Sequence, residues 1–142
     1  MMKKTVSLIA CLFALSACNA VSTQSTTTNT SQKSVAVAKV VEVHNKKELD
    51  TIVQEEKVVL IYFYAMWAGP SMILKPVIED AAKELNVSVA LVDVDKAEDK
   101  FYEQYNVDRV PVTGLVKNQQ TVDVFIGVKS KDEVVNFIKP HL

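Results

Sequence analysis

The stretch that decides the fold is VVLIYFYAMWAGPSMILKPVIEDAAKEL, residues 58–85. Its first seven residues, Val58 to Tyr64, are a continuous β-branched and aromatic run. Such a run is typical of a central parallel strand covered on both faces. After a short loop, Pro70 suits the first turn of a helix, and Pro76 should kink that helix because it lacks a backbone N–H. Two apolar stripes at helical spacing support the helix: Ile73, Val77, Ala81 and Leu85, and beside them Leu74, Ile78 and Ala82.

The segments on either side continue the alternation of strands and helices. The pattern predicts four more strands, at Lys39–Val43, Val87–Val94, Val112–Val116 and Thr121–Ile126, with the last two forming a hairpin around Asn118-Gln119. It predicts three more helices, at about residues 45–55, at Ala97–Tyr105, and from the capping box of Ser130 and Glu133 to Pro140. The order β-α-β-α-β-α-β-β-α indicates an α/β domain, a mixed sheet with helices on both faces.

Several residues of this domain occur in order at the spacing of one known family. They are the apolar strand, Trp67, Gly69-Pro70, Pro76, Val110-Pro111, Lys117-Asn118 and Gly127. On these residues, positions 39–142 resemble thioredoxin. The resemblance implies a thioredoxin-like fold, with a central mixed β-sheet of about five strands flanked by about four helices. It also implies that the Val110-Pro111 bond is cis and faces the Trp-Ala-Gly-Pro-Ser loop.

The chemistry of that family needs two thiols, one that attacks a substrate disulfide and one that resolves the mixed disulfide. Here the attacking position is Ala68 and the resolving position is Ser71, so the catalytic residues are absent. The resemblance also implies a buried acid at Tyr62 and a nearby lysine at Leu91, and both have been replaced. Tyr62 is interpreted as a core aromatic, with a new functional role as the alternative. Four coordinated departures indicate a natively redox-inactive chain.

The N-terminus has the features of a targeting signal. Lys3 and Lys4 precede an apolar segment, Val6–Leu15, which is too short to span a bilayer. The run Leu15-Ser16-Ala17-Cys18 resembles the lipobox of bacterial lipoproteins, which implies cleavage before Cys18 and its acylation. We therefore expect a lipoprotein signal peptide at 1–17, then a lipidated cysteine and flexible tether at 18–38, and the domain at 39–142. The alternative is a plain secretory signal with a chance cysteine.

Cysteine and charge counts narrow the function further. The two cysteines are Cys11, inside the signal segment, and Cys18, so the mature chain would have no free thiol and no internal disulfide. Of the 16 basic residues, 14 would remain against 17 acidic ones, a net charge of −3. Such a chain lacks the basic surface that nucleic-acid binding needs, so we expect no nucleic-acid partner.

Metal and cofactor sites are not indicated either. His44 and His141 lie at opposite ends of the domain sequence and are interpreted as surface residues. Three glycines in the whole chain nearly exclude a phosphate-binding loop, so no cofactor is expected. Asp93 and Asp95 alternate with apolar residues at a strand end, which favours strand-end solubility over acid/base chemistry.

What remains is a surface that the resemblance implies is a peptide-binding groove. Its expected residues are Met66, Trp67, Gly69, Pro70, Val110, Pro111 and Gly127. The first functional hypothesis is a membrane-anchored, periplasm-facing module that binds an extended peptide or an envelope protein. The alternatives are a thioredoxin-family thiol-disulfide oxidoreductase in redox homeostasis and a structural remnant. Asn19 after the lipid cysteine, in place of an inner-membrane-retaining Asp, favours the outer membrane.

Overall fold

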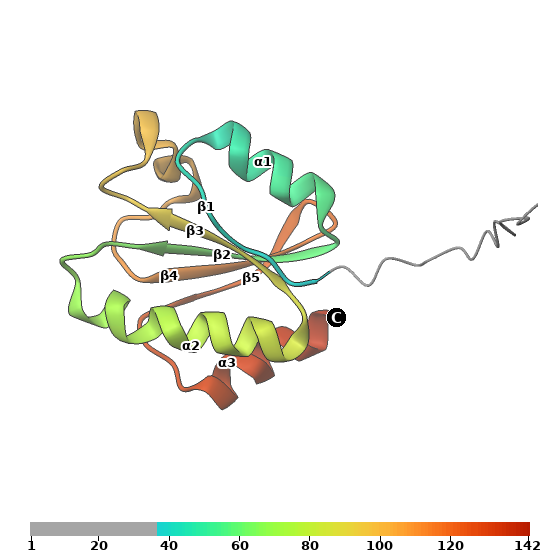
Figure 1. Ribbon diagram of the computed structural model, residues 1–142. Coiled ribbons are helices and arrows are strands. Elements are labelled where there is room, and N and C mark those ends of the chain that lie inside the picture. The colour runs from blue at the N-terminus through green and yellow to red at the C-terminus, as the bar shows by residue number, and fades with distance from the viewer. Residues whose placement is uncertain (1–36) are drawn as a thin grey trace, which may run out of the picture. The chain divides into compact units, whose positions relative to one another are not determined.

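The computed structural model of the chain describes residues 37–142. Its strands are β1 (Val40–Glu42), β2 (Val58–Tyr64), β3 (Ser88–Asp93), β4 (Val112–Lys117) and β5 (Gln120–Ile126). Its helices are α1 (Lys46–Glu55), α2 (Gly69–Leu85), the 3₁₀ segment η1 (Glu98–Tyr105), α3 (Lys131–Ile138) and the short 3₁₀ turn η2 (Lys139–His141). Figure 1 shows these elements along the chain.

The strands form one mixed sheet in the order β1-β3-β2-β4-β5. β3 pairs in parallel with β1 and β2, whereas β4 is antiparallel to both β2 and β5. Helices α2 and α3 pack on one face of the sheet, while α1 and η1 contribute to a second hydrophobic cluster on the other face. The predicted α/β architecture, a five-stranded mixed sheet flanked by helices on both faces, is confirmed.

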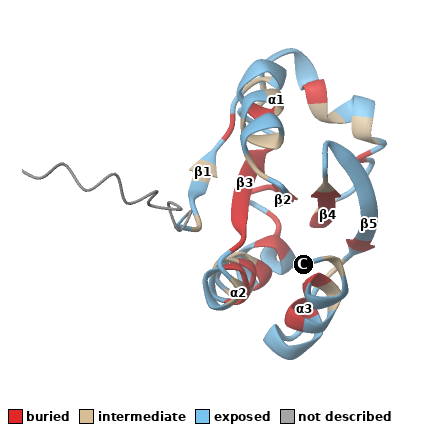
Figure 2. Cartoon of the chain, turned by 90° about the vertical axis from the view of Figure 1, so that its right-hand side faces the viewer, coloured by how far each residue is buried: buried red, intermediate tan, exposed pale blue. Residues whose placement is uncertain are grey.

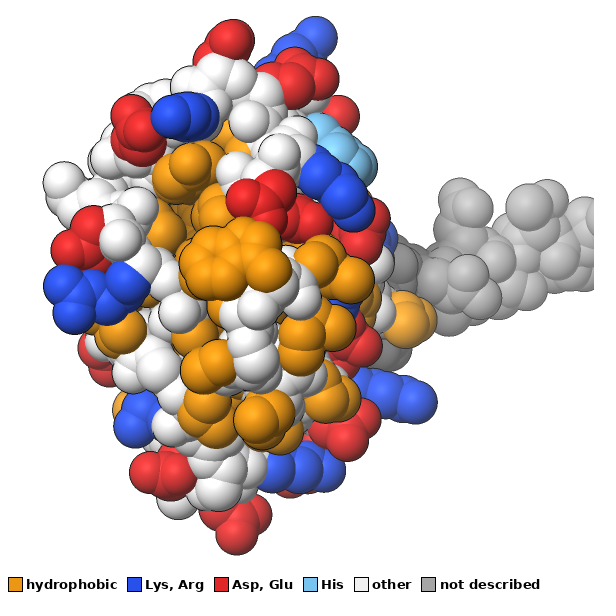
Figure 3. All heavy atoms as spheres, turned by 90° about the vertical axis from the view of Figure 1, so that its left-hand side faces the viewer, with side chains coloured by type: hydrophobic (Ala, Val, Ile, Leu, Met, Phe, Trp, Pro, Cys, Tyr) orange, Lys and Arg blue, Asp and Glu red, His pale blue; other side chains and the backbone are white. Residues whose placement is uncertain are grey.

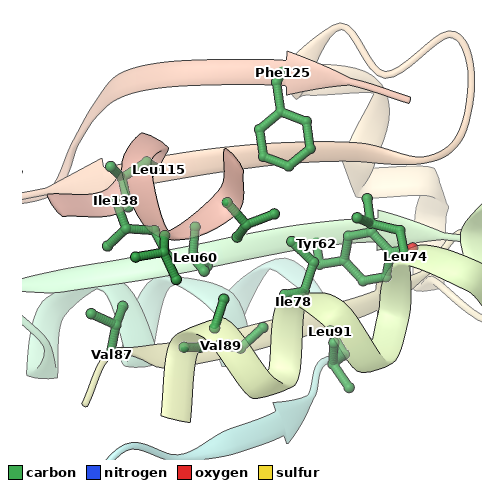
Figure 4. Close-up of a cluster of buried hydrophobic side chains, with 14 of the residues drawn as sticks. Leu60, Tyr62, Leu74, Ile78, Val87, Val89, Leu91, Leu115, Phe125 and Ile138 are labelled. Carbon is green, nitrogen blue, oxygen red and sulfur yellow. The ribbon is translucent and has the colours of Figure 1, made fainter. Parts of the chain in front are cut away.

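Strand β2 lies at the centre of the sheet, and six of its seven residues are buried. Its side chains alternate between the two faces because the strand repeats every two residues. Leu60, Tyr62 and Tyr64 belong to the cluster beneath α2 and α3, and Val59, Ile61 and Phe63 belong to the cluster beneath α1 and η1. Figure 4 shows the first of these clusters, with the Tyr62 ring beside Leu74 of α2. The boundaries predicted for this strand are confirmed.

Helix α2 follows β2 after a four-residue loop, with Pro70 in its first turn and Pro76 inside it. Its buried side chains are Ser71, Leu74, Ile78, Ala81 and Ala82. Leu74, Ile78 and Ala82 of one predicted stripe face the sheet, and Val77, Ala81 and Leu85 of the other pack against the same cluster. Ile73, the first residue of the latter stripe, is 63% exposed and is not part of the core.

Several local predictions are confirmed. Asn45 caps α1 by accepting from the Glu48 N–H, and Ser130 with Glu133 forms a complete capping box at α3. The Val110-Pro111 bond is cis. Asn118 and Gln119 both have positive φ, as the tight turn of the β4–β5 hairpin requires.

Other local predictions need correction. The predicted helix at Ala97–Tyr105 is a 3₁₀ segment, broken where Asp99 and Lys100 adopt left-handed backbone conformations. The α-helix α3 does end directly before Pro140, at Ile138 with Lys139 as its C-cap, but Pro140 itself lies in the 3₁₀ turn η2, which was not predicted. Proline is tolerated there because the first turn of a helix needs no donor.

The predictions for the signal peptide at 1–17 and for lipid on Cys18 lie outside the described residues, as does most of the predicted tether. At its end, the Ala38 N–H already donates to the Asn86 side chain. Within residues 37–142, no helix is both long enough and apolar enough to cross a membrane.

Candidate functional site

The tryptophan loop, the cis-proline and Gly127 lie at the same end of the sheet. The loop follows Tyr64, the last residue of β2, and the cis-proline precedes β4, whose Val112 pairs with Phe63. The Gly127 N–H donates to the Pro111 carbonyl at 3.0 Å, which holds the end of β5 against the cis-proline. Trp67 and Val110 line one cleft of about 340 Å³. The sheet therefore brings together the residues predicted for the groove.

The surface at this end is apolar and open. The side chain of Trp67 is 73% exposed and that of Met66 is 55% exposed, while Pro111 is buried. Further exposed apolar side chains come from α2 and from the end of β5, namely Met72, Ile73, Ile126 and Val128. Figure 3, which views this end, shows hydrophobic side chains gathered at its centre. An exposed apolar patch of this kind is typical of an interaction site.

The two positions that would carry thiols are both buried. Ala68 is 7% exposed and precedes the first turn of α2, where it provides no side-chain cap. Ser71 is fully buried, and its hydroxyl accepts a long hydrogen bond of 3.5 Å from the Ala65 N–H. The methyl group of Ala68 is not a nucleophile, and the buried hydroxyl of Ser71 cannot form a disulfide. Neither side chain can therefore take part in dithiol exchange.

Tyr62 occupies the position of the expected acid and is fully buried. Its O–H donates to the backbone carbonyl of Ser71 at 2.6 Å, and its ring stacks on Tyr64 with centroids 5.6 Å apart. Burial raises the pKa of Tyr62, and the hydrogen bond to Ser71 opposes this only in part. Tyr62 is a core aromatic, as predicted, and it also ties the central strand to the first turn of α2.

Leu91 lies beside Tyr62 on the parallel strand β3 and is buried in the same cluster. The two replacements fit one another physically. An acid and a lysine at these positions would be costly to bury, whereas tyrosine and leucine fill the space with apolar surface. The one polar atom that they introduce, the Tyr62 hydroxyl, is hydrogen-bonded.

One polar cluster, which links α2, β2 and β1, was not predicted from the sequence. Lys75 of α2 places its ammonium group 4.6 Å from the centroid of the Tyr64 ring and 3.9 Å from the Glu42 carboxylate. These residues lie on three different elements, so no local pattern marks them. The exposed side chains of Met72 and Ile73 were also not predicted as part of this surface, because the spacing of apolar residues along α2 does not show which of them face solvent.

The prediction that Asp93 promotes strand-end solubility is wrong. Its side chain is buried, with one carboxylate oxygen accepting from the Asp95 N–H and the other lying 3.4 Å from the Lys96 ammonium. Asp93 therefore closes the turn after β3. His44 and His141 pair with different acids, Glu48 and Asp123, and no group of metal-binding side chains was found among residues 37–142.

The fold and this end of the sheet together define a thioredoxin-like protein. The family model for thioredoxin matches residues 39–140, and the chain therefore belongs to the thioredoxin family. Thioredoxin from Chlamydia trachomatis is 39% identical over 84 residues, which are 58% of this chain and 81% of that protein. Thioredoxin-T from Drosophila melanogaster is 37% identical over 103 residues, which are 70% of this chain and 64% of that protein.

Solved structures give the same result. A mutant thioredoxin from Halobacterium salinarum superposes with a TM-score of 0.68 at 31% identity, covering 72% of this chain and 90% of that chain. Thioredoxin from Fasciola hepatica superposes with a TM-score of 0.65 at 28% identity, covering 73% of this chain and 99% of that chain.

Removing the Tyr62 hydroxyl should weaken the fold in a pH-dependent way. We expect Tyr62→Phe to lower the free energy of unfolding by about 1 kcal/mol at neutral pH, because a buried hydrogen bond is lost. Burial raises the pKa of Tyr62 above 10.0, its ordinary value, so only the unfolded chain loses this proton as the pH first exceeds 10. The stability due to the neutral hydroxyl is therefore complete below pH 10 and declines above it.

Urea unfolding of both proteins between pH 7 and pH 11 measures this difference. The gap in stability between the native chain and Tyr62→Phe should narrow above pH 10. Tyr102→Phe, at a partly exposed site, is the matched control and should change stability little at any pH. A gap that stays constant up to pH 11 contradicts the account of Tyr62.

Proposed function

We propose that this chain is a membrane-anchored thioredoxin-like module of the bacterial cell envelope that binds an extended peptide or an envelope protein and does not catalyse dithiol exchange. The observation that carries the proposal is the state of the active-site loop. Ala68 and Ser71 occupy the two thiol positions, and the carbonyl of Ser71 is bound by the buried Tyr62 hydroxyl. The loop is thus built into the core through groups that have no redox chemistry.

Binding does not depend on those thiols. The groove residues Met66, Trp67, Gly69 and Pro70 are exposed, and Val110 is half-buried beside them. Exposing 73% of a tryptophan to water is unfavourable in free energy. Such a side chain suits a binding surface, where aromatic side chains contribute strongly to affinity. An extended peptide would cover it together with the neighbouring apolar side chains.

The place where the chain enters the domain is compatible with an anchor that precedes it. The Ala38 N–H bonds to Asn86, which follows the last residue of α2, whereas the groove lies at the start of that helix. The 17 residues of α2 separate these two ends by about 25 Å. Figure 1 shows the chain entering β1 at the end of the domain opposite the tryptophan loop. A tether that joins the domain at this end would leave the groove residues uncovered by the attachment itself.

Family membership favours a second candidate, a thioredoxin-family thiol-disulfide oxidoreductase. This activity would need cysteines in or near the groove. Both cysteines of the chain precede the domain, at Cys11 and Cys18, and the lipoprotein hypothesis removes the first and acylates the second. The binding module is therefore the better-supported function.

Trp67→Ala should separate binding from the rest of the molecule. We expect the full chain, used as bait in envelope extracts, to capture a partner protein. The Trp67→Ala variant should capture about tenfold less of that partner, because a central aromatic contact is lost. Val40→Ala is the matched control, since Val40 is 48% exposed but lies on β1, at the far edge of the sheet. Quantitative mass spectrometry of the bound proteins gives the ratios. Equal recovery by the native chain and Trp67→Ala contradicts binding through the groove.

The anchor is tested independently of the groove. If Cys18 carries lipid, Cys18→Ser should release the protein from the membrane fraction or leave its signal peptide uncleaved. Density-gradient fractionation of the native chain then distinguishes the inner from the outer membrane, of which Asn19 favours the outer. An unmodified mature terminus at another residue, detected by mass spectrometry, would overturn the lipid anchor without affecting the groove.

A further inference from the structure

One face of the edge strand β5 is exposed to solvent. β5 is an edge strand, and six of its seven residues are exposed. Val122, Val124 and Ile126 alternate along it and are 42%, 50% and 58% exposed, while Phe125 packs under α3 on the opposite face. In Figure 2, β5 is pale blue along most of its length, whereas β3 is red. An apolar strip on an exposed strand is unusual unless something covers it.

Beside this strip lies a hollow of about 350 Å³. Its lining consists of Ile61, Phe63, Gln104, Tyr105, Asn106, Val112, Gly114, Val116, Thr121 and Val124. Ile61, Phe63, Val112 and Val116 are also members of the hydrophobic cluster beneath α1 and η1. The hollow is therefore an opening into the edge of the core.

Gly114 marks the part of the hollow that lies on β4. A Cβ atom built on Gly114 meets nothing within 4 Å, and its φ lies outside the left-handed region. Neither close packing nor backbone conformation therefore requires glycine here. Glycine inside a strand costs about 0.5–1 kcal/mol and often marks a place where a ligand or another backbone approaches closely. The missing side chain leaves space that a bound group can fill.

We propose that the hollow at Gly114 receives one large, uncharged apolar side chain of the same extended peptide that occupies the groove. This inference rests on the proposed function and names the class of peptide. The two surfaces are neighbours along the chain, because Val112, which lines the hollow, directly follows the cis-proline Pro111 of the groove. Ile126 pairs with Val112, which lines the hollow, and the next residue, Gly127, bonds to the cis-proline of the groove.

The chemistry of the lining selects the occupant. No charged side chain lines the hollow, so a charged group would lose water there without gaining a counter-ion. Gln104, Asn106 and Thr121 are exposed and bring uncharged donors and acceptors to it. Such groups can satisfy the peptide bonds on either side of a buried side chain.

Other occupants fit less well. The residues before the domain, Asn19–Ser34, are largely polar, and the chain enters through β1 at the opposite edge of the sheet. A second copy that added a strand to β5 would have to displace at least one existing hydrogen bond, because the Val124 N–H already donates to the Asp123 carboxylate at 2.9 Å. A separate peptide lying on the face of β4 and β5 meets neither obstacle.

The three glycines of the chain provide a direct test. Gly114 reports on the hollow, while Gly69 and Gly127 report on the groove, so ¹⁵N amide spectra distinguish the two surfaces. The probe is N-acetylphenylalaninamide, which carries one apolar side chain between two peptide groups. We expect saturable shifts at Gly114 with this probe and none with the amide of N-acetylaspartate, which carries a charge.

Gly114→Leu should fill the hollow without harming the fold. We expect unchanged or raised thermal stability, because glycine is removed from a strand, and binding of the probe weakened about tenfold or more as followed at Val124. Gln54→Leu on the exposed surface of α1 adds the same side chain elsewhere and should leave probe binding unchanged.

The outcomes separate the two proposals. Shifts at Gly69 and Gly127 without any at Gly114 would overturn the proposal that the hollow binds a side chain, and would leave the proposed groove binding unaffected. Shifts at Gly114 together with failure of the Trp67→Ala test preserve the hollow as a side-chain pocket but overturn its link to a groove-bound peptide. Self-association that Gly114→Leu abolishes, measured by sedimentation velocity, would assign the hollow to a second copy and overturn the proposal.

Discussion

The hydrogen bond from the Tyr62 hydroxyl to the Ser71 carbonyl joins the central strand of the sheet to the first turn of α2. The loop between these elements carries Trp67, so its direction depends on this connection. The bond is buried and short, and the tyrosine ring that makes it is packed between α2 and β3. Because the strand and the helix are fixed to each other, the loop presents Met66 and Trp67 to solvent while Ala68 and Ser71 turn inward.

Peptide binding and dithiol exchange are two properties of the thioredoxin fold that need different features. A groove that binds a peptide needs exposed apolar side chains and a rigid frame, whereas dithiol exchange needs an accessible thiolate and a route for protons. The chain has the first set of features. At the positions of the second set it has a methyl group, a buried hydroxyl, a tyrosine with raised pKa and a leucine. These replacements favour a stable core over proton transfer, consistent with the proposed binding module.

Much of the fold could be predicted because its signals are local. The length and composition of Val58–Tyr64 indicate a buried strand. The helix caps at Asn45 and Ser130 depend on residues only three positions apart. The assembly of the groove followed from a resemblance, which carried the pairing of distant segments. Helical spacing alone did not show which apolar residues of α2 are buried: Ile73 is exposed, whereas Val77, Ala81 and Leu85 of the same stripe pack against the core. The Tyr62–Ser71 bond and the hollow at Gly114 depend on distances between elements, which no local pattern contains.

The proposal that the loop is redox-inactive is tested most directly by insulin reduction with dithiothreitol. The native mature domain, which contains no cysteine, should give no rate above the uncatalysed reaction. Ala68→Cys combined with Ser71→Cys restores both thiols at the start of α2, and we expect it to show weak activity, because Tyr62 and Leu91 supply no proton transfer. Turnover by the native domain would contradict the redox-inactive proposal, and full activity of the double variant would contradict the role assigned to Tyr62 and Leu91.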